Sequence, residues 1–592
     1  MEKGYWDKFW ARRLSRRSAL AVGATGAAAV GFAAVGCGDD DDDDDNGSSD
    51  PGPSGSPSGD ATQAGGGGQG SDEPTRGGTL ITFDNADPPS FDVISSFGYR
   101  QSQCSSLAWP TLMRYTESPD RGPLDFNNVE PQLAESLEQP DDTTVVFTLR
   151  PNTLFEDREP FNGRELTAED IVNSWEYYAS TSGTRVILAP YVDSVEAVDA
   201  RTVRFNLNQP SATFVRYMAH HGSFYPVPVE LVDAGTSGTD PVGFGPYQLE
   251  RYDQGVEIEW VKNPNFYGAD TIYPDNLIMK IFRDPSTATT AARSKQLHTT
   301  TWWNLPEADA ADLQASLPDA TFVSFPNTFG WYLGMDLRMP EFEDERVRRA
   351  LSMALDREAM LALYEVGEGR GAYASAIAPQ PPWWLDPRDR NAEYGEHGQW
   401  FQNDPGEARA LLEAAGFGDG LGPYQLFTNQ GFGPNHIQTS ELVQQQLAEI
   451  GISVDIVVQD NAAYYSTTVI GNFEGALANQ PGIGQVEPDE ALQLEYRGDS
   501  GRSAISGRED VLTPENEPQF FDLLTRQQQE LDAEVRQELI NEIQVYLAGR
   551  MYYIPMAVEP ITLFHQAELG GVNPLRAYNL SWLYAGSHVR SA

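Results

Sequence analysis

One segment of the chain has the glycine-flanked serine that some hydrolases use as a nucleophile. It reads Gly498-Asp499-Ser500-Gly501. A serine becomes nucleophilic when a histidine takes its proton and a third group orients that histidine. The chain has seven histidines, and none of them lies in a recognisable partner motif. We therefore expect a polar loop at Ser500 rather than a catalytic centre.

Metal and acid–base chemistry have equally weak signals. Two adjacent histidines, His220 and His221, do not have the spacing with which one helix face holds a metal, so we expect a surface pair. With 87 acidic residues in the chain, some carboxylates will be neighbours by chance, and a carboxylate pair alone does not indicate glycosidase chemistry. We expect no metal site and no cofactor.

A glycine-containing segment could be misread as a phosphate-binding loop. The segment Pro241-Val242-Gly243-Phe244-Gly245-Pro246-Tyr247 lacks the Gly-Lys-Ser/Thr ending of such loops, and no helix clearly follows it. It is better interpreted as a structural turn, whose glycines permit a positive φ or a close approach of two backbones.

Pairs of aromatic residues are the more informative constellation. They are Trp302-Trp303, Trp331-Tyr332 and Trp383-Trp384. Neighbouring residues of a strand point to opposite faces, so only one member of each pair could face a cleft. Such a residue could stack on the apolar or cyclic part of a ligand while polar groups fix its orientation. Packing in a core explains each pair equally well.

Length and charge limit the classes of protein to consider. A chain of 592 residues exceeds the size of one hydrophobic core, so two or more domains are expected. The formal net charge of −47 argues against a nucleic-acid partner, because a phosphate backbone would be repelled. The two cysteines are Cys37 and Cys104. If Cys37 is acylated, no disulfide framework exists.

The first 37 residues have the layout of an export signal. A basic start is followed by the uncharged run 19–35, which is slightly short and weakly apolar for a spanning helix. The arginine pair Arg16-Arg17 before this run resembles a twin-arginine (Tat) signal. Small residues before Cys37 resemble a lipobox, although Ala34 stands where Leu is usual. A plain Sec signal, with an incidental Cys37, is the alternative.

The segment 38–76 is rich in Asp, Gly, Ser and Pro. It contains the aspartate run Asp39–Asp45 and the glycine run Gly65–Gly68. A segment of this composition buries no apolar surface, so we predict a disordered tether.

Helices and strands alternate along the rest of the chain. Alternating apolar residues predict strands at 77–83, 145–149, 203–207, 256–260 and 452–458. Capping residues predict helices that begin after Thr167, Asp344 and Asp404. Another helix ends at Gly451 and leads directly into a strand, which indicates an α/β unit. Long helical patterns extend from Pro518 to Leu547.

The order of short motifs resembles the family 5 extracellular solute-binding proteins, the dipeptide- and oligopeptide-binding components of ABC importers. The motifs lie at 77–80, 87–92, 131–136, 147–151, 155, 166–172, 241–247 with 263–267, and 345–351 with 355–358. Each motif is weak alone, but together they cover residues 77 to about 560 in the family's order. Two segments depart from the pattern, Ser294–Thr299 and the segment around Glu487.

The resemblance implies an α/β, two-lobed periplasmic-binding-protein-like fold of type II, with an extra subdomain in lobe one. Lobe one would be 77–304 completed by 556–592, and lobe two would be 305–555. Glycines 243 and 245 would then lie where the lobes meet. A ligand would bind between the lobes, which would close around it like a hinged clamp.

The resemblance also suggests which side chains meet the ligand. Peptide binders of this family hold the ligand's α-amino group with a carboxylate, and Glu487 stands at the matching position. We predict ligand contacts from Tyr99, Trp302, Trp303, Trp331, Tyr332 and Glu487.

The sequence thus predicts a monomeric receptor, anchored to the cell membrane by a lipid on Cys37, that hands a short peptide to an ABC permease. No Walker A motif occurs in the chain, so the ATPase would be a separate subunit. An oligosaccharide or a metal chelate is an alternative ligand for the same fold. From other classes, a secreted glycosidase or peptidase and a surface sensor or adhesive scaffold stay open.

Overall fold

The computed structural model describes residues 74–95, 98–116, 128–220, 222–300, 307–364, 371–380, 382–432, 434–460, 463–482, 487–500, 505–571 and 587–589. The chain divides into the units 1–72 and 73–592, and all described residues belong to the second unit. The predicted signal, with Arg16, Arg17 and Cys37, lies outside the described residues, as does the predicted tether up to residue 73.

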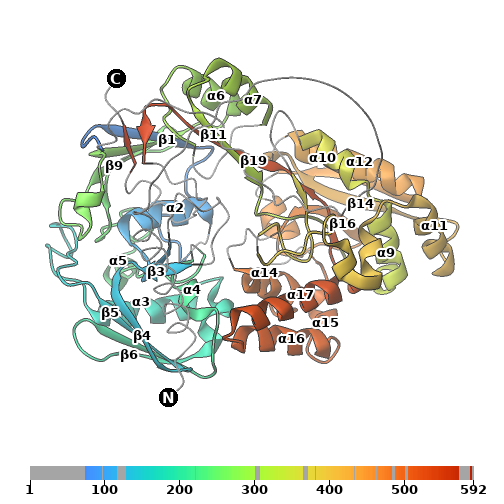
Figure 1. Ribbon diagram of the computed structural model, residues 1–592, viewed down its shortest axis with the longest axis horizontal. Helices are drawn as coiled ribbons and strands as arrows, with labels where there is room; N and C mark the ends of the chain where they lie inside the picture. The colour runs from blue at the N-terminus through green and yellow to red at the C-terminus, as the bar shows by residue number, and fades with distance from the viewer. Residues whose placement is uncertain are drawn as a thin grey trace, which may run out of the picture. The chain divides into compact units, whose positions relative to one another are not determined.

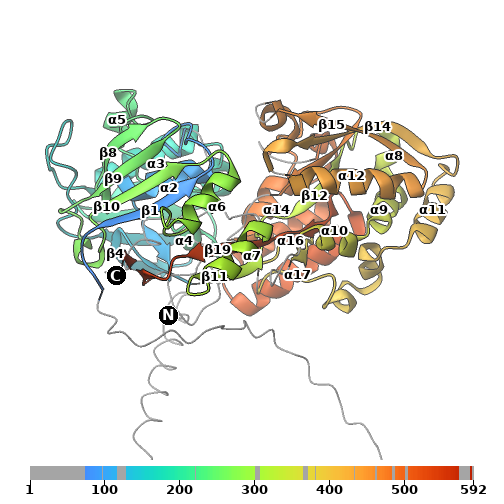
Figure 2. The ribbon, with the colours of Figure 1, turned by 90° about the horizontal axis from the view of Figure 1, so that it is seen from above.

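The described chain opens with a strand of a four-stranded sheet. In spatial order the strands are β1 (Thr79–Asp84), β10 (Asn276–Ile281), β9 (Glu257–Lys262) and β8 (Tyr247–Asp253). Strand β1 pairs parallel with β10, and the other pairs are antiparallel. The four strands lie side by side in Figure 2. Leu80 and Trp260 are fully buried, which confirms the alternating patterns that predicted strands here.

A second four-stranded sheet is antiparallel throughout. Its order is β4 (Ala134–Asp141), β5 (Thr144–Leu149), β7 (Thr202–Leu207) and β6 (Val192–Ala197). Helix α3 (Ala168–Thr181) contacts β6 and β7 through a stripe that includes Ile171 and Trp175. The N–H of Thr167 donates to Asp170 at 2.7 Å, so the predicted capping box is confirmed.

The largest core forms around a five-stranded mixed sheet. The strand order is β15 (Ile452–Gln459), β14 (Leu421–Asn429), β16 (Ala476–Pro481), β12 (Trp331–Met335) and β17 (Ile554–Pro555). Helix α12 (Pro434–Glu449) links the parallel strands β14 and β15 and lies against both (Figure 2). Gly451 has φ +86° between this helix and β15. The predicted α/β unit is therefore confirmed.

Helices surround this sheet, and several begin at predicted caps. They are α9 (Glu345–Ala354), α10 (Arg357–Tyr364), α11 (Pro405–Ala414), α14 (Pro488–Tyr496), α16 (Pro518–Gln529) and α17 (Ala533–Arg550). Asp344 accepts from the N–H of Arg346, and Asp404 from that of Glu407, both at 2.9 Å. The helical patterns predicted at 518–547 are confirmed as the two helices α16 and α17, and Asp532 caps the second.

Two strands, which we call the crossing strands, connect the five-stranded sheet to the part of the chain that precedes it. Strand β11 (Thr321–Pro326) leads into the five-stranded sheet, and β19 (Pro560–His565) leads out of it. They pair antiparallel over all six residues and lie side by side in Figure 1. Phe564 of β19 packs in one cluster with Phe83 of β1.

The remaining elements are short. The helices are α2 (Tyr99–Ala108), α4 (Phe214–Tyr217), α5 (Val229–Asp233), α6 (Pro285–Arg293), α7 (Glu307–Ser316), α8 (Pro340–Glu343) and α15 (Arg508–Val511). The strands are β2 (Met113–Tyr115), β3 (Val129–Pro131), β13 (Ala372–Tyr373), β18 (Ala557–Val558), β20 (Leu569–Gly570) and β21 (His588–Val589).

The glycines of the 241–247 segment permit a close backbone approach. A Cβ on Gly243 would lie 2.1 Å from the carbonyl oxygen of Ala108, and one on Gly245 would lie 2.1 Å from that of Leu107. The N–H groups of Phe244 and Gly245 donate to the Ala108 oxygen. The prediction of a structural turn is confirmed, but its contact is with the end of α2 in the N-terminal part of the chain.

Candidate functional site

Trp331, the first predicted ligand residue of β12, lies in an aromatic cluster. Its ring centroid is 4.5 Å from that of His436 and 5.3 Å from that of Phe432. Its indole N–H donates to the carboxylate of Glu559, which directly precedes β19. The side chain is only 7 % exposed. Trp331 therefore links α12 to the start of a crossing strand.

Tyr332, the next residue, is fully buried on the other side of the strand. A Cβ at Gly330 or Gly482 would lie within 2.4 Å of its ring. Two glycines thus make the room for this tyrosine. Its ring centroid is 5.2 Å from that of Tyr553. Its hydroxyl has no hydrogen-bond partner among the residues that the structure describes.

Glu487 has its own set of neighbours at the start of α14. Its carboxylate forms ion pairs with Arg216 of α4 and with Arg536 of α17. The three side chains are at most 4 % exposed. Burial alone would raise the pKa of Glu487, but Arg536 and Arg216 lower it to about 2. The carboxylate is thus ionised and already bonded by two protein cations.

An indole ring completes this group. The guanidinium of Arg536 lies 4.9 Å from the ring centroid of Trp383, and that of Arg216 lies 6.0 Å from it. Both distances are within the reach of a cation–π contact. We call Glu487, Arg216, Arg536 and Trp383 the Glu487 cluster. Sequence reasoning found Glu487 but missed the arginines, which are 271 and 49 positions away.

Other polar contacts continue the same interface. The hydroxyl of Tyr217 donates to Asp489 at 2.9 Å. Burial raises the pKa of the Asp489 carboxyl to about 6. Nearby, the Nε2 atom of His220 lies 3.0 Å from a carboxylate oxygen of Glu490.

The surface position predicted for the histidine pair is wrong for His220, which is fully buried. Its Nδ1 atom accepts the N–H of Gly222 at 2.9 Å. In the neutral ring the proton is then on Nε2, facing Glu490. Burial is tolerated because both ring nitrogens have polar neighbours. His221 lies outside the described residues.

The other predicted ligand residues lie on or before other elements of the chain. Tyr99 is the first residue of α2, and Trp302 and Trp303 lie outside the described residues. The structure places Trp331 and Tyr332 next to each other on β12. It does not bring Glu487 into contact with them: the partners of Glu487 are Arg216 and Arg536.

In the segment 498–501, the described residues Asp499 and Ser500 bond to neighbouring groups of the protein. Ser500 Oγ donates to the carbonyl oxygen of Leu494 at 2.6 Å, and Asp499 is paired with Arg497. Within the described ranges, no group of three His, Cys, Asp or Glu side chains is placed to hold a metal ion.

The sequence and the fold were compared with those of known proteins. The sequence model of the bacterial extracellular solute-binding proteins, family 5 (middle region), matches residues 128–501. The chain belongs to this family. It is thus a solute-binding protein of the kind that serves ABC importers, and its fold is the two-lobed α/β fold of these proteins.

The solute-binding protein has relatives with assigned ligands. It is 26% identical over 460 residues to di/tripeptide-binding protein 1 of Pseudomonas aeruginosa (strain UCBPP-PA14), over 72% of this chain and 79% of that protein. A similar solved structure is the ABC transporter-associated periplasmic binding protein DppA from Helicobacter pylori with the peptide STSA. It has a TM-score of 0.70 and 21% identity, over 87% of this chain and 99% of that one.

The same fold also occurs with a ligand that is not a peptide. The structure of AgaA from A. tumefaciens R10 with agropinic acid has a TM-score of 0.72 and 21% identity, over 87% of this chain and 99% of that one. In the solute-binding protein itself, the described part of the chain has no helix both long and apolar enough to cross a membrane.

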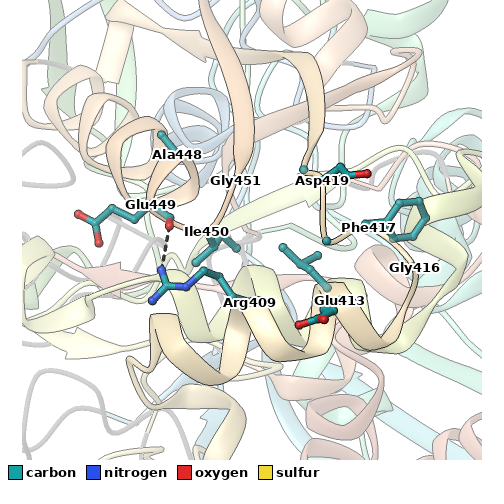
Figure 3. A pocket seen from close by; sticks show the side chains of 12 residues that line it. Arg409, Glu413, Gly416, Phe417, Asp419, Ala448, Glu449, Ile450 and Gly451 are labelled. Carbon is teal, nitrogen blue, oxygen red and sulfur yellow. Dashed lines mark hydrogen bonds between the residues drawn. The ribbon is translucent and has the colours of Figure 1, made fainter.

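A surface hollow of about 690 Å³ lies at the ends of α11 and α12 (Figure 3). In it the side chain of Arg409 donates to the carbonyl oxygen of Glu449 at 2.9 Å. None of the predicted ligand residues lines it. This hollow of the solute-binding protein is therefore separate from the predicted ligand site.

Proposed function

We propose that this solute-binding protein captures a short peptide between its two lobes and delivers it to an ABC permease, without making or breaking a bond. The observation that carries this proposal is the 26% identity over 460 residues with a di/tripeptide-binding protein. The match covers 72% of this chain and 79% of that protein. The ATPase that powers transport is a separate subunit.

The paired strands β11 and β19 support a hinged closure. We take lobe one as 77–304 with 556–592 and lobe two as 305–555, so that β11 belongs to lobe two and its partner β19 to lobe one. Two paired crossing segments allow the lobes to rotate about them, as in other hinged binding proteins. Ligand contacts formed with both lobes at once favour the closed state.

The ligand wall that we propose combines Tyr99, Trp302, Trp303 and Trp331, while the fully buried Tyr332 supports β12 from its other side. The position of Trp331 supports this assignment, because its indole N–H donates to Glu559 directly before β19. A ligand that contacts Trp331 would therefore also affect the crossing. The protein acts as a monomer, exported by the Tat-like signal and held at the membrane by a lipid on Cys37.

A thermal-shift screen of the full chain tests the ligand class. Dipeptides, tripeptides and longer peptides are compared with oligosaccharides and metal chelates. A ligand at 100 times its Kd stabilises the folded state by about 2.7 kcal/mol. We expect peptides to raise the melting temperature. A response only to sugars or chelates would contradict the peptide assignment, and cleavage of a compound would indicate a hydrolase.

A pair of tryptophan variants locates the site. Trp331→Phe removes the N–H that Glu559 accepts, and we expect about tenfold weaker peptide binding. Trp400→Phe is the control, because that indole donates to His397 instead. The anchor is tested separately: Cys37→Ser should release the protein from the membrane, and continued membrane retention would exclude acylation at this residue.

A further inference from the structure

Asp489, in the first turn of α14, is a completely buried carboxylate. Tyr217 of α4 donates a hydrogen bond to it at 2.9 Å, and Gln528 of α16 donates one at 3.3 Å. The side-chain amides of Gln493 and Gln527 donate to it as well. Among the residues that the structure describes, Asp489 thus has four neutral donors and no ion pair. A charge in this position is hydrogen-bonded but not compensated.

The buried charges around Asp489 do not balance. The other charged side chains of this part of the described structure are two guanidinium groups and two carboxylates, namely Arg216, Arg536, Glu487 and Glu490. Both arginines form ion pairs with Glu487. Glu490 instead lies 3.0 Å from the ring of His220, which is charged only if it is protonated. Three carboxylates therefore face two guanidinium groups, and one proton would make this buried group neutral.

The other titratable groups around these carboxylates do not change the balance. They are tyrosine hydroxyls whose pKa burial raises, so that they stay protonated, namely Tyr115, Tyr191 and Tyr217. Arg497, the residue after α14, is paired with Asp499 at 2.6 Å. Arg185, on a short helix that contacts α14, is exposed and donates to the carbonyl oxygen of Ser182. The missing positive charge is therefore not supplied by any of these side chains.

This group of charges lies where two distant stretches of the chain meet, 191–220 and 487–536. The N–H of Ala212 donates to the carbonyl oxygen of Gln528, and the amide of Gln528 donates to the hydroxyl of Tyr191. Such polar contacts are typical of surfaces that separate, because water can replace each partner. Under the proposed boundaries the first stretch belongs to lobe one and the second to lobe two. Opening of the lobes would then expose Asp489 to water.

We propose that Asp489 makes the closing of these two stretches proton-dependent: it binds one proton when they come together and releases it when they separate. The proton would lie between Oδ2 of Asp489 and the hydroxyl oxygen of Tyr217, which are 2.9 Å apart, because a hydroxyl accepts as well as donates. The receptor therefore closes more readily in acidic surroundings. This inference rests on the proposed function in one respect, namely that the two lobes open and close.

The direction of the effect follows from the two states of the carboxyl group. Burial raises the pKa of Asp489 from 3.8 to about 6 when the stretches are in contact, and exposure to water returns it to its ordinary value. The proton thus favours the closed form fully below the ordinary value, and this advantage is lost as the pH rises through 6. One pH unit below 6, the bound proton favours the closed form about tenfold.

Small-angle X-ray scattering of the unliganded full chain tests this dependence without a ligand. The radius of gyration of the parent should be larger at about pH 7.5 than at about pH 5. In Asp489→Asn, whose amide is neutral at both pH values, we expect the smaller radius at both. An equal radius of the parent at the two pH values would overturn the proposal, and this comparison does not require that any variant folds.

Two further variants serve as controls. Asp522→Asn removes an exposed carboxylate paired with Arg526 and should keep the pH dependence of the parent. His220→Gln removes the other group of this contact that can bind a proton near neutral pH, and it should also keep the dependence. If the dependence disappears in His220→Gln and persists in Asp489→Asn, the proton binds to the histidine and the proposal is wrong.

Calorimetry counts the proton directly. Titrations of a peptide in two buffers of different ionisation enthalpy, at about pH 5, should show the uptake of nearly one proton by the parent and of none by Asp489→Asn. Peptide binding without proton uptake in the parent would contradict the role of Asp489. If no peptide binds, the peptide assignment fails, while the scattering still decides whether the closing of the two stretches depends on Asp489.

Discussion

Arg216 and Glu487 lie 271 positions apart in the sequence and form an ion pair that is almost completely excluded from water. The desolvation of two charges is costly, and it is tolerated here because Arg536 and Trp383 contact the same groups. Removing one member of such a pair leaves the other buried and uncompensated. The pair is therefore a sensitive point for the stability of the fold.

The first prediction concerns stability. Glu487→Gln should lower the free energy of unfolding by about 3–5 kcal/mol, because Arg216 and Arg536 lose their shared carboxylate. Urea unfolding followed by circular dichroism measures the change. Asp522→Asn is the control, since its ion pair with Arg526 is exposed and should leave the urea midpoint unchanged. A loss for Glu487→Gln no larger than that of the control would contradict the prediction.

The second prediction concerns pH. Burial lowers the pKa of His436 to about 3 and that of His565 to about 4, below the ordinary value of 6.5. As the pH falls below 6.5, the unfolded chain binds these protons first, so the folded state loses stability towards pH 4. Each proton contributes a slope of up to about 1.4 kcal/mol per pH unit.

The variant His436→Gln should reduce this slope by up to one proton between pH 6 and pH 4. Asp489 acts in the opposite direction: its pKa is raised to about 6, so its contribution is present at low pH and is lost as the pH rises through 6. Unfolding free energies measured in Asp489→Asn separate the two effects. An unchanged slope in His436→Gln would show that this ring is protonated in the folded state.

The third prediction concerns the approach of two backbones. Gly245→Ala would bring a Cβ within 2.1 Å of the carbonyl oxygen of Leu107. The backbone must shift, and we expect a loss of about 1–3 kcal/mol. Gly183→Ala is the matched control, because nothing lies within 4 Å of its added Cβ. Thermal melting of both variants decides the question, and equal melting temperatures would contradict the close contact.

The fourth prediction concerns the hydroxyl of Tyr332. Because this buried hydroxyl has no partner among the described residues, Tyr332→Phe should change stability by less than about 1 kcal/mol. Tyr394→Phe is the comparison, since its hydroxyl donates to the carbonyl oxygen of Leu385 at 2.7 Å, and we expect a loss of about 0.5–1.5 kcal/mol. A larger loss for Tyr332→Phe than for Tyr394→Phe would show that the Tyr332 hydroxyl is bonded in solution.

Local features could be predicted from sequence because their causes are local. Asp344 and Asp404 cap helices through N–H groups two or three residues away. The alternation in β15 follows from one face being buried. The two-lobed fold could be predicted as well, because the family's motifs mark turns and helix caps in a fixed order along the chain. These predictions depend on neighbours along the chain.

The contacts of the candidate site depend on residues that are distant in the sequence. Nothing near His220 shows that Glu490 will face it, or that both will be buried. Likewise, Glu487 was identified from its position, but its two arginines come from different helices. A buried carboxylate requires a compensating group. That rule predicts that a cation exists without naming Arg216 or Arg536.

The return of the chain along β19 has a consequence for synthesis. Phe564 belongs to the same cluster as Phe83, and the N–H of Gln566 donates to the carbonyl oxygen of His298. The amino-terminal half therefore lacks the packing contacts of Phe564 while the ribosome is still synthesising the middle of the chain. Its completion waits for the synthesis of β19, so a product that ends before this strand would expose the apolar side chains around Phe83 and become a substrate for proteases.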